Sequence, residues 1–346
     1  MKKNALAVLA AALAAALIIL SVGKPRPDAG AFVDDRAGVL TEEGRRRVAG
    51  LSAAVLRDLD IHIKTVTLEE SPGDLNIKTV ELFEEHALGG GTRGARGVLF
   101  VVDPKGQRVR VETGYDLEAV FPDGFVGYLE RRQMAPFFRE GRVGAGVEAA
   151  VELLVGRAMG EVDASAYNAG EDLPRGPYLS GGGGASSAMA IGSDAPVKEE
   201  SPLRDRFGPQ PLPEAAMRKY IEALELRVKD PWLGLYTPET REFLAGWTVN
   251  DAQQENELRG LYESFPEATV FEEGGLAVVR FPVARRGAPP YFLRRGEEGW
   301  MLDLAAMGRL VGFNHKNQWF FRDRSHEYMF AFQDLRFDAN GFPHRD

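Results

Sequence analysis

The segment GVLFVVDPKGQRVRVETG, residues 97–114, decides the fold of the first half of this chain. It begins with an unbroken apolar run, residues 97–102, which is typical of a strand buried on both faces of a sheet. The next residues, Asp-Pro-Lys-Gly at 103–106, follow the preferences of a type I turn. Apolar and polar residues then alternate over 109–113. The sequence therefore predicts two antiparallel strands joined by a tight turn.

Helical patterns surround this hairpin. Thr41 is a suitable cap for a helix whose apolar residues recur at helical spacing up to Leu59, and Asp74 can cap a second helix. A β-rich segment, residues 61–68, separates them. Two more helices are expected, at about 123–139 and 143–154. The resulting order predicts an α/β fold, an α/β/α sandwich with a mixed sheet, for residues 28–160.

Composition excludes several classes of function. The net charge of −9 and the lack of a clustered basic face argue against binding to nucleic acid. The chain has no cysteine, so disulfides, thiolate catalysis and cysteine-based zinc sites are excluded.

The N-terminal residues predict a membrane segment. An uncharged, almost wholly apolar stretch runs from Ala5 to Gly23 and is about long enough to span a bilayer as a helix. Small residues near Gly23 would also suit a cleaved signal peptide. We favour a retained signal anchor within residues 1–27, because no polar region precedes that site. The expected location is the cell envelope, with the protein anchored in the inner membrane and its domains on the periplasmic or extracellular side.

The second half of the chain differs in composition. Residues 161–212 are rich in Gly, Pro and Ser without apolar periodicity, and predict a flexible linker with a reach of about 40 Å. Residues 213–346 first show helical periodicity and then short β-rich segments separated by turn residues. A last strand is expected at 328–332. This order predicts a separate α+β half-barrel domain.

Several short motifs follow one another in the first domain: FVDD at 32–35, GVL at 38–40, GVLFVV at 97–102, RVRVETGY at 108–115, and MAPFFREG at 134–141. Over about residues 32–156 they resemble the TPM domain family of bacterial and chloroplast envelope proteins. The resemblance implies an α/β/α sandwich and a signal or membrane anchor. Some members are described as calcium-binding or phosphatase-like, and chloroplast members are linked to maintenance of photosynthetic membrane complexes. This chain departs from the family at Arg96-Gly97, where members usually have Asn-Gly.

The second domain more loosely resembles the nuclear-transport-factor-like cone fold. The resemblance depends on YFLRR at 291–295 followed by GWMLDL at 299–304, which predicts a hairpin with a buried tryptophan. Aromatic residues of this domain could line a cone-shaped pocket for a small ligand, or could simply form its core: Trp232, Trp247, Tyr262, Tyr291 and Trp300. Asp303 is a candidate acid of such a pocket.

Carboxylates form the candidate metal site. Five of them flank the ends of predicted strands: Asp34, Asp35, Asp103, Glu118 and Asp123. Each has an ordinary explanation as a turn, cap or solvated residue. As a set, and with the family resemblance, they predict a site for a hard cation such as Ca²⁺, which needs several oxygen ligands on adaptable backbone.

Catalytic motifs are absent from the sequence. Gly89–Gly94 spells G-x-G-x-x-G, but it follows a helix and precedes a strand, which is the wrong context for a dinucleotide site. Arg93 and Arg96 of this loop could meet an anion or remain solvated. The five histidines are scattered. A phosphatase would therefore need a metal held by the same carboxylates.

These observations predict a membrane-tethered envelope protein with a non-enzymatic TPM-like domain and a second binding domain. It would assist or assemble envelope protein complexes, and its expected partners are the membrane, through the N-terminal helix, and other envelope proteins. Two alternatives stay open: a metal-dependent phosphatase acting on phosphomonoesters, and binding of a small ligand by the C-terminal domain.

Overall fold

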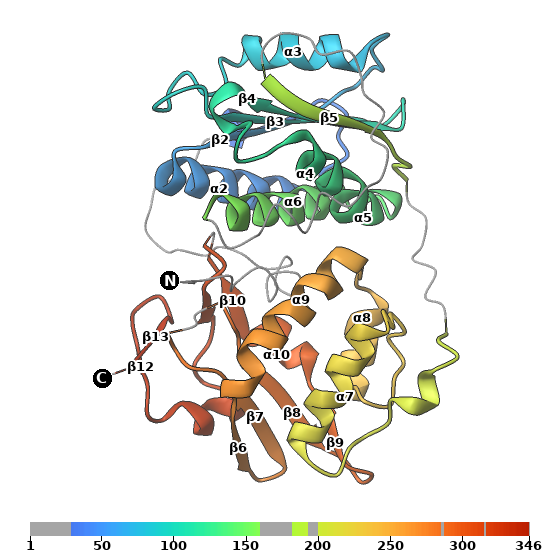
Figure 1. Ribbon diagram of the computed structural model, residues 1–346, viewed down its shortest axis with the longest axis vertical. Coiled ribbons are helices and arrows are strands. Elements are labelled where there is room, and N and C mark those ends of the chain that lie inside the picture. Colours follow the sequence, from blue (N-terminus) through green and yellow to red (C-terminus); the bar gives the residue numbers. More distant parts are fainter. Residues whose placement is uncertain (1–28, 160–181, 193–199, 285–286, 315, 346) are drawn as a thin grey trace. The chain divides into compact units, whose positions relative to one another are not determined.

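The structure is a computed structural model, which describes residues 29–159, 182–192, 200–284, 287–314 and 316–345 (Figure 1). The chain divides into two units, with the boundary between Ala195 and Pro196. The predicted anchor, residues 1–27, lies outside the described residues. Among the residues that the structure describes, no helix is both long and apolar enough to cross a membrane.

The first unit is built on a five-stranded mixed sheet with the strand order β1-β2-β3-β4-β5. The strands are β1 (Val33–Asp35), β2 (His62–Thr67), β3 (Gly97–Asp103), β4 (Arg108–Gly114) and β5 (Gly182–Ala188). The first three pair in parallel, and β4 and β5 pair antiparallel. The predicted hairpin of β3 and β4 is confirmed.

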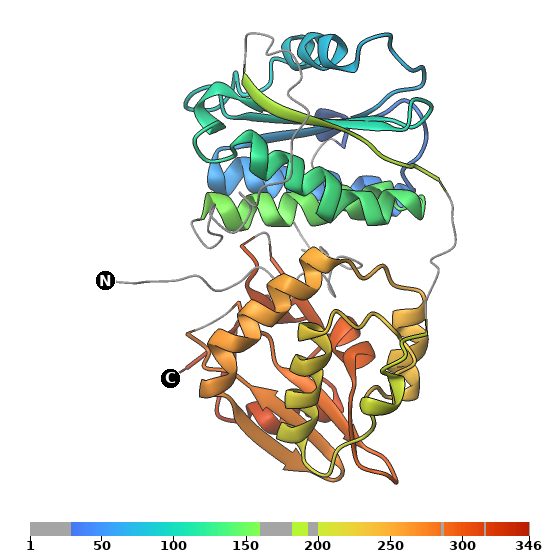
Figure 2. The ribbon, with the colours of Figure 1, turned by 45° about the vertical axis from the view of Figure 1, so that its right-hand side comes forward.

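Helices cover both faces of this sheet (Figures 1 and 2). They are α1 (Ala29–Phe32), α2 (Glu42–Leu59), α3 (Leu75–Glu85), α4 (Asp123–Tyr128), α5 (Ala135–Arg139) and α6 (Val143–Ala158). Helix α3 lies on one face, and α2, α4, α5 and α6 lie on the other. The predicted α/β/α sandwich with a mixed sheet is confirmed.

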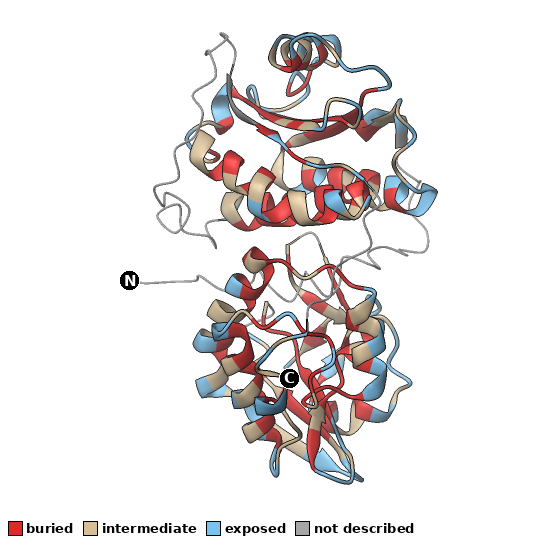
Figure 3. Ribbon diagram, turned by 90° about the vertical axis from the view of Figure 1, so that its right-hand side faces the viewer, coloured by how far each residue is buried: buried red, intermediate tan, exposed pale blue. Residues whose placement is uncertain are grey.

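Local sequence explains these elements. Thr41 caps α2, because its Oγ1 accepts a hydrogen bond from the Gly44 amide at 3.0 Å. Asp74 caps α3 in the same way. All residues of β3 are buried, as expected for the central strand of a sheet covered on both faces (Figure 3).

Two parts of the predicted linker, residues 161–212, have regular contacts. Strand β5 pairs with β4 along its whole length. Farther along the chain, Phe207 is fully buried, and Gln210 exchanges backbone hydrogen bonds of 3.0 and 2.7 Å with Trp300 of the second unit. Strand β5 was not predicted because its Gly, Ala and Ser residues show almost no hydrophobic periodicity. The remaining linker residues, 161–181 and 193–199, lie outside the described residues.

The helix predicted at 123–139 is divided. Between α4 and α5 lies a π-helical segment, η2 (Leu129–Met134). Segments of this kind are rare, because the wider turn weakens backbone hydrogen bonding. In η2 the widened turn directs Glu130 toward β4 and β5, where it accepts hydrogen bonds from both strands.

The second unit has a four-stranded antiparallel sheet with the order β6-β7-β8-β9. These strands are β6 (Thr269–Glu273), β7 (Leu276–Arg280), β8 (Tyr291–Arg295) and β9 (Trp300–Leu302). The helices are α7 (Pro213–Glu225), α8 (Pro238–Ala245), α9 (Asp251–Ser264) and α10 (Leu304–Leu310). Helices α7 and α10 pack on the sheet, α9 packs on α7, and α8 packs on α10, which agrees with the predicted α+β region.

Short strands complete the second unit: β10 (Val311–Phe313), β11 (Trp319–Phe321), β12 (Arg336–Phe337) and β13 (Pro343–His344). The strand predicted at 328–332 is wrong, since Glu327–Phe332 forms the 3₁₀ helix η6. Its buried residues are Tyr328, Ala331 and Phe332. That spacing of three and four residues suits a helical turn rather than a strand.

Candidate functional site

Asp34 and Asp35, the predicted metal ligands of β1, are already bonded to nearby residues of the chain. Asp35 accepts a hydrogen bond of 2.6 Å from the Thr67 hydroxyl, and it accepts the amides of Val39 and Leu40 at 3.2 and 3.0 Å. Asp34 forms an ion pair of 2.7 Å with Arg36. These contacts fix the turn that leads from β1 to α2.

Asp103 is fully buried at the end of β3. It accepts hydrogen bonds from the Ser71 hydroxyl at 2.7 Å, the Gly106 amide at 2.8 Å and the Arg108 guanidinium at 2.7 Å. Burial raises the pKa of Asp103, but these donors outweigh burial, and the net pKa is lowered. Asp103 is therefore an ionised residue that holds the hairpin turn.

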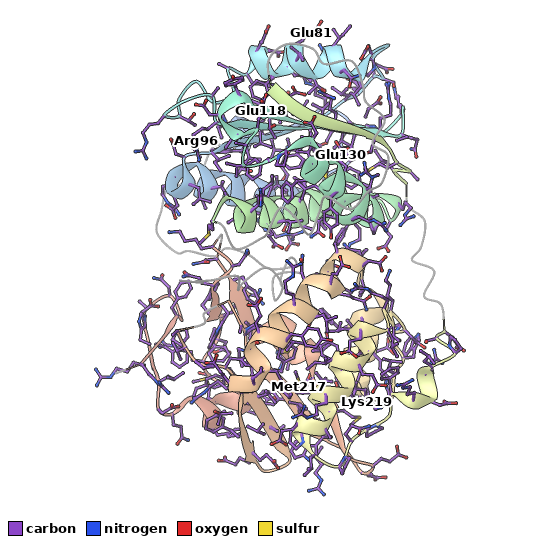
Figure 4. The ribbon with its side chains drawn as sticks, in the orientation of Figure 1. Glu81, Arg96, Glu118, Glu130, Met217 and Lys219 are labelled. Atoms are coloured by element: carbon purple, nitrogen blue, oxygen red, sulfur yellow. The ribbon has the colours of Figure 1, made fainter. Side chains whose placement is uncertain are left out.

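The remaining candidates, Glu118 and Asp123, lie beyond the far end of β4. Strand β4 runs antiparallel to β3, so its last residues pair with the start of β3. Asp103 lies at the other end of β3, about 20 Å away at the usual rise per residue. Figure 4 shows Glu118 at the same end of the sheet as Arg96, which precedes β3. The five carboxylates are thus divided between the two ends of the sheet.

The five predicted metal ligands are therefore not gathered in one place. Glu112 lies near Glu118 and Asp123, and its pKa is raised by burial and by their negative charges. Glu112 is paired with Arg110. Among the residues that the structure describes, no group of three or more His, Cys, Asp or Glu side chains could hold a metal ion. The five predicted residues do not form one site, and calcium binding stays a prediction.

Arg96 of the glycine-rich loop has a structural role. Its guanidinium donates to the carbonyls of Asp60 and Leu59 at 3.0 and 3.3 Å. These carbonyls belong to the C-terminal end of α2, where a cation is favoured by the helix dipole. Arg93 is exposed and lies 3.5 Å from the carboxylate of Asp60. The Arg96 guanidinium therefore already has backbone carbonyls as partners and does not need an anion.

A cavity of about 50 Å³ lies among α7, α8 and α9 of the second unit. We call it the Glu257 pocket and define it by six of its lining residues: Tyr220, Tyr236, Trp247, Gln253, Gln254 and Glu257. One water needs on the order of 10–15 Å³, so the space suits a group of a few heavy atoms. The pocket combines aromatic walls with a carboxylate and two amides.

Glu257 is the unusual residue of this pocket. The hydroxyls of Tyr220 and Tyr291 both donate to its Oε1 atom at 2.7 Å. Its Oε2 atom has no hydrogen-bond donor among the described residues. Burial raises the pKa of Glu257 to about 7, although the two hydroxyl donors lower it. One oxygen is held firmly, and the other remains available.

Two glutamines of α9 are incompletely bonded. Gln254 donates through Nε2 to the Val228 carbonyl at 2.8 Å, which leaves its buried Oε1 without a partner among the described residues. Gln253 accepts the Asn250 amide through Oε1 at 2.9 Å, and its buried Nε2 has no partner there. Unsatisfied buried groups cost free energy and are rare in folded proteins. Both atoms are closed off from solvent, so they do not open on the cavity that the two residues line.

The aromatic residues predicted for this domain have different positions. Trp247 lines the Glu257 pocket, and Tyr291 donates to Glu257 from β8. Trp300 is buried in the core, whereas Trp232 and Tyr262 are 38% and 54% exposed. These two do not enclose a pocket.

Asp303 has a structural role in the second unit. Its carboxylate accepts the Ala306 amide at 3.0 Å, as the cap of α10, and the Tyr328 hydroxyl at 2.7 Å. The acid of the pocket is Glu257 instead, which sequence reasoning missed. A signal was present: Gln253, Glu257 and Leu261 recur every four residues, so polar residues share a helix face with a buried leucine.

Comparison with known proteins concerns the first unit. Residues 33–157 match the family model described as the TPM domain. The recognition of a TPM domain is confirmed. A solved structure that matches is the solution NMR structure of the N-terminal domain of a protein from P. gingivalis. It is 28% identical, with a TM-score of 0.33, and the match covers 37% of this chain and 84% of that one. No curated protein matches this sequence.

Proposed function

We propose that this chain is a binding protein whose second unit holds a small ligand in the Glu257 pocket. The observation that carries the proposal is the uneven use of the Glu257 carboxylate, with both tyrosine hydroxyls on Oε1 and no protein donor on Oε2 among the described residues. A buried carboxylate normally has all its oxygens satisfied. A ligand that meets Oε2 would complete the set.

The pocket proposal can be tested on the full chain with three small probes of similar size: ethanolamine, ethylene glycol and acetate. Saturation-transfer NMR should detect binding of at least one of them. Leu224 lines the pocket, so Leu224→Phe should fill it and abolish the signal. Leu226→Phe is the matched control, since Leu226 is 44% exposed two residues farther along the chain. Binding of no probe, or binding that survives Leu224→Phe, would refute the proposal.

The TPM unit is proposed to act as a non-enzymatic module that assists or assembles envelope protein complexes. The TPM match and the apolar stretch from Ala5 to Gly23 support this proposal. A phosphatase would need carboxylates gathered around one ion, whereas Asp103 and Glu118 lie at opposite ends of β3 and β4. That geometry favours the binding alternative.

The tether is a separate part of the proposal. We expect the mature protein to retain residues 1–23 and to remain with the membrane after a carbonate wash, because the stretch is long enough to span a bilayer. Its domains would then face the periplasm or the cell exterior. Cell fractionation with N-terminal sequencing checks this. A mature chain that begins near Lys24 and is recovered in the soluble envelope fraction would contradict the tether.

A further inference from the structure

The Glu257 carboxylate lacks a counter-charge. Among the described residues, no Lys, Arg or His side chain forms an ion pair with it, and burial is the main cause that shifts its pKa. Lys229 also lines the cavity, but its ammonium group lies 2.6 Å from the Asp251 carboxylate. Asp230, another lining residue, is paired with Arg204 at 2.7 Å. Glu257 therefore contributes the uncompensated negative charge of the pocket.

The walls of the pocket also favour a positively charged ligand. Tyr220, Tyr236 and Trp247 present aromatic rings, and the faces of such rings attract cations. The rings of Tyr220 and Tyr236 meet edge to face with centroids 6.3 Å apart, and Tyr291 packs on Tyr220 at 6.0 Å. This packing holds the rings in place. An anion would meet both the carboxylate and the negative ring faces.

Hydrogen bonding and size narrow the ligand further. Glu257 Oε2 is an acceptor without a donor among the described residues. A primary ammonium group carries three N–H donors and can satisfy it. The unpartnered side-chain atoms of Gln253 and Gln254 are closed off from the cavity and take no part. The cavity of about 50 Å³ suits a short chain.

We infer that the Glu257 pocket binds a primary ammonium ion on a short polar chain, with the ammonium group between Glu257 and the aromatic rings. The inference rests on the proposed function and names the chemical class of its ligand. No bond is made or broken. Recognition depends on the charge of the ligand and on its N–H donors.

The experiment is calorimetric titration of the full chain at pH 8 with ethanolamine, ethylene glycol and choline. Ethanolamine should bind best: ethylene glycol lacks the charge, and choline lacks N–H donors. Glu257→Gln keeps the acceptor for both tyrosines, and it should weaken ethanolamine binding at least about 30-fold, as expected for a buried charged pair. Glu255→Gln is the matched control, because Glu255 lies on the same helix and pairs with Arg227 at the surface.

Several outcomes would overturn the inference. These are equal affinity for ethanolamine and ethylene glycol, tighter binding of choline, or unchanged ethanolamine affinity in Glu257→Gln. If acetate or ethylene glycol binds at least as tightly as ethanolamine and Leu224→Phe abolishes that binding, the proposed function stands and the ammonium assignment fails.

A second measurement needs no substitution, in case Glu257→Gln does not fold. In the unaltered chain, ethanolamine affinity should rise between pH 6 and pH 8, because the Glu257 carboxyl must ionise to pair with the cation. The other ionisable groups that face it, Tyr220, Tyr236 and Tyr291, have raised pKa values through burial and remain neutral over this range. Constant affinity across this range would overturn the inference.

Discussion

Glu130 of the first unit and Glu257 of the second are both buried glutamates that use their oxygens differently. In Glu130, Oε1 accepts the Val111 amide at 3.0 Å and Oε2 accepts the Ser187 hydroxyl at 2.5 Å. It thereby joins η2 to strands β4 and β5 (Figure 4). In Glu257 both donors share Oε1. The first carboxylate is satisfied by its own chain, and the second has one oxygen without a donor among the described residues.

This difference teaches which property marks a binding site. Burial raises the pKa of Glu130 to about 8 and that of Glu257 to about 7. If the size of the pKa shift identified a binding residue, it would identify Glu130. The hydrogen bonds indicate Glu257 instead, because a residue can contact a ligand only through an atom that has no partner in its own chain. A raised pKa reports desolvation, which structural and binding residues share.

The largest expected effect that tests this comparison is pH dependence of stability. A carboxyl whose folded pKa is raised stabilises the fold fully below its unfolded pKa of about 4.5, and that stability is lost as pH rises through the folded pKa. Between about pH 4.5 and 8, Glu130 should cost the first unit about 5 kcal/mol. Between about pH 4.5 and 7, Glu257 should cost the second unit about 3 kcal/mol.

Each unit offers its own signal for this measurement. All four tryptophans lie in the second unit, so their fluorescence follows its unfolding in denaturant. Hydrogen exchange of the β3 amides follows the first unit. Glu130→Gln should reduce the pH dependence of β3 exchange and leave fluorescence unchanged, with the remaining dependence due to Glu148 and Glu152, whose pKa values burial also raises. Glu257→Gln should reduce only the pH dependence of fluorescence. Ethanolamine should restore second-unit stability above pH 7 and leave β3 unchanged. If Glu130→Gln changes neither profile, the carboxyl of Glu130 is not desolvated as described.

Much of the fold could be predicted from the sequence because it depends on local pattern. The apolar run 97–102, the turn at 103–106 and the cap at Thr41 each impose one conformation on a few neighbouring residues. Strand β5 could not be predicted, because its backbone pairs with β4 while its small side chains carry no pattern. Predicting this pairing requires knowing where a distant segment returns.

The candidate site was harder to predict for the same reason. Asp34, Asp35 and Asp103 lie at predicted strand ends, yet sequence cannot tell which donors already occupy them. Glu257 lies within a polar stretch of α9, and its partners Tyr220 and Tyr291 come from α7 and β8. Whether a carboxylate keeps an oxygen without a donor depends on what surrounds it, and three separate segments determine this for Glu257.

The smallest expected effect concerns Ser187, which supplies one of the two donors to Glu130. Ser187→Ala leaves the Val111 amide in place but removes the donor to Oε2. The first unit should lose about 1 kcal/mol of unfolding free energy, measured by hydrogen exchange of β3, because one buried hydrogen bond is lost. The pKa of Glu130 should rise further, since that hydroxyl lowers it.

A matched control for Ser187 exists in the same unit. Ser52 of α2 is also buried, but its hydroxyl has no partner among the described residues. Ser52→Ala should therefore leave stability unchanged or raise it slightly, because no hydrogen bond is lost and a buried polar group is removed. Neither variant should alter ethanolamine binding in the second unit. If Ser187→Ala destabilises the first unit no more than Ser52→Ala does, Glu130 is not held through both oxygens. Glu130 would then have an oxygen as available as that of Glu257, and oxygen occupancy would no longer distinguish the two glutamates.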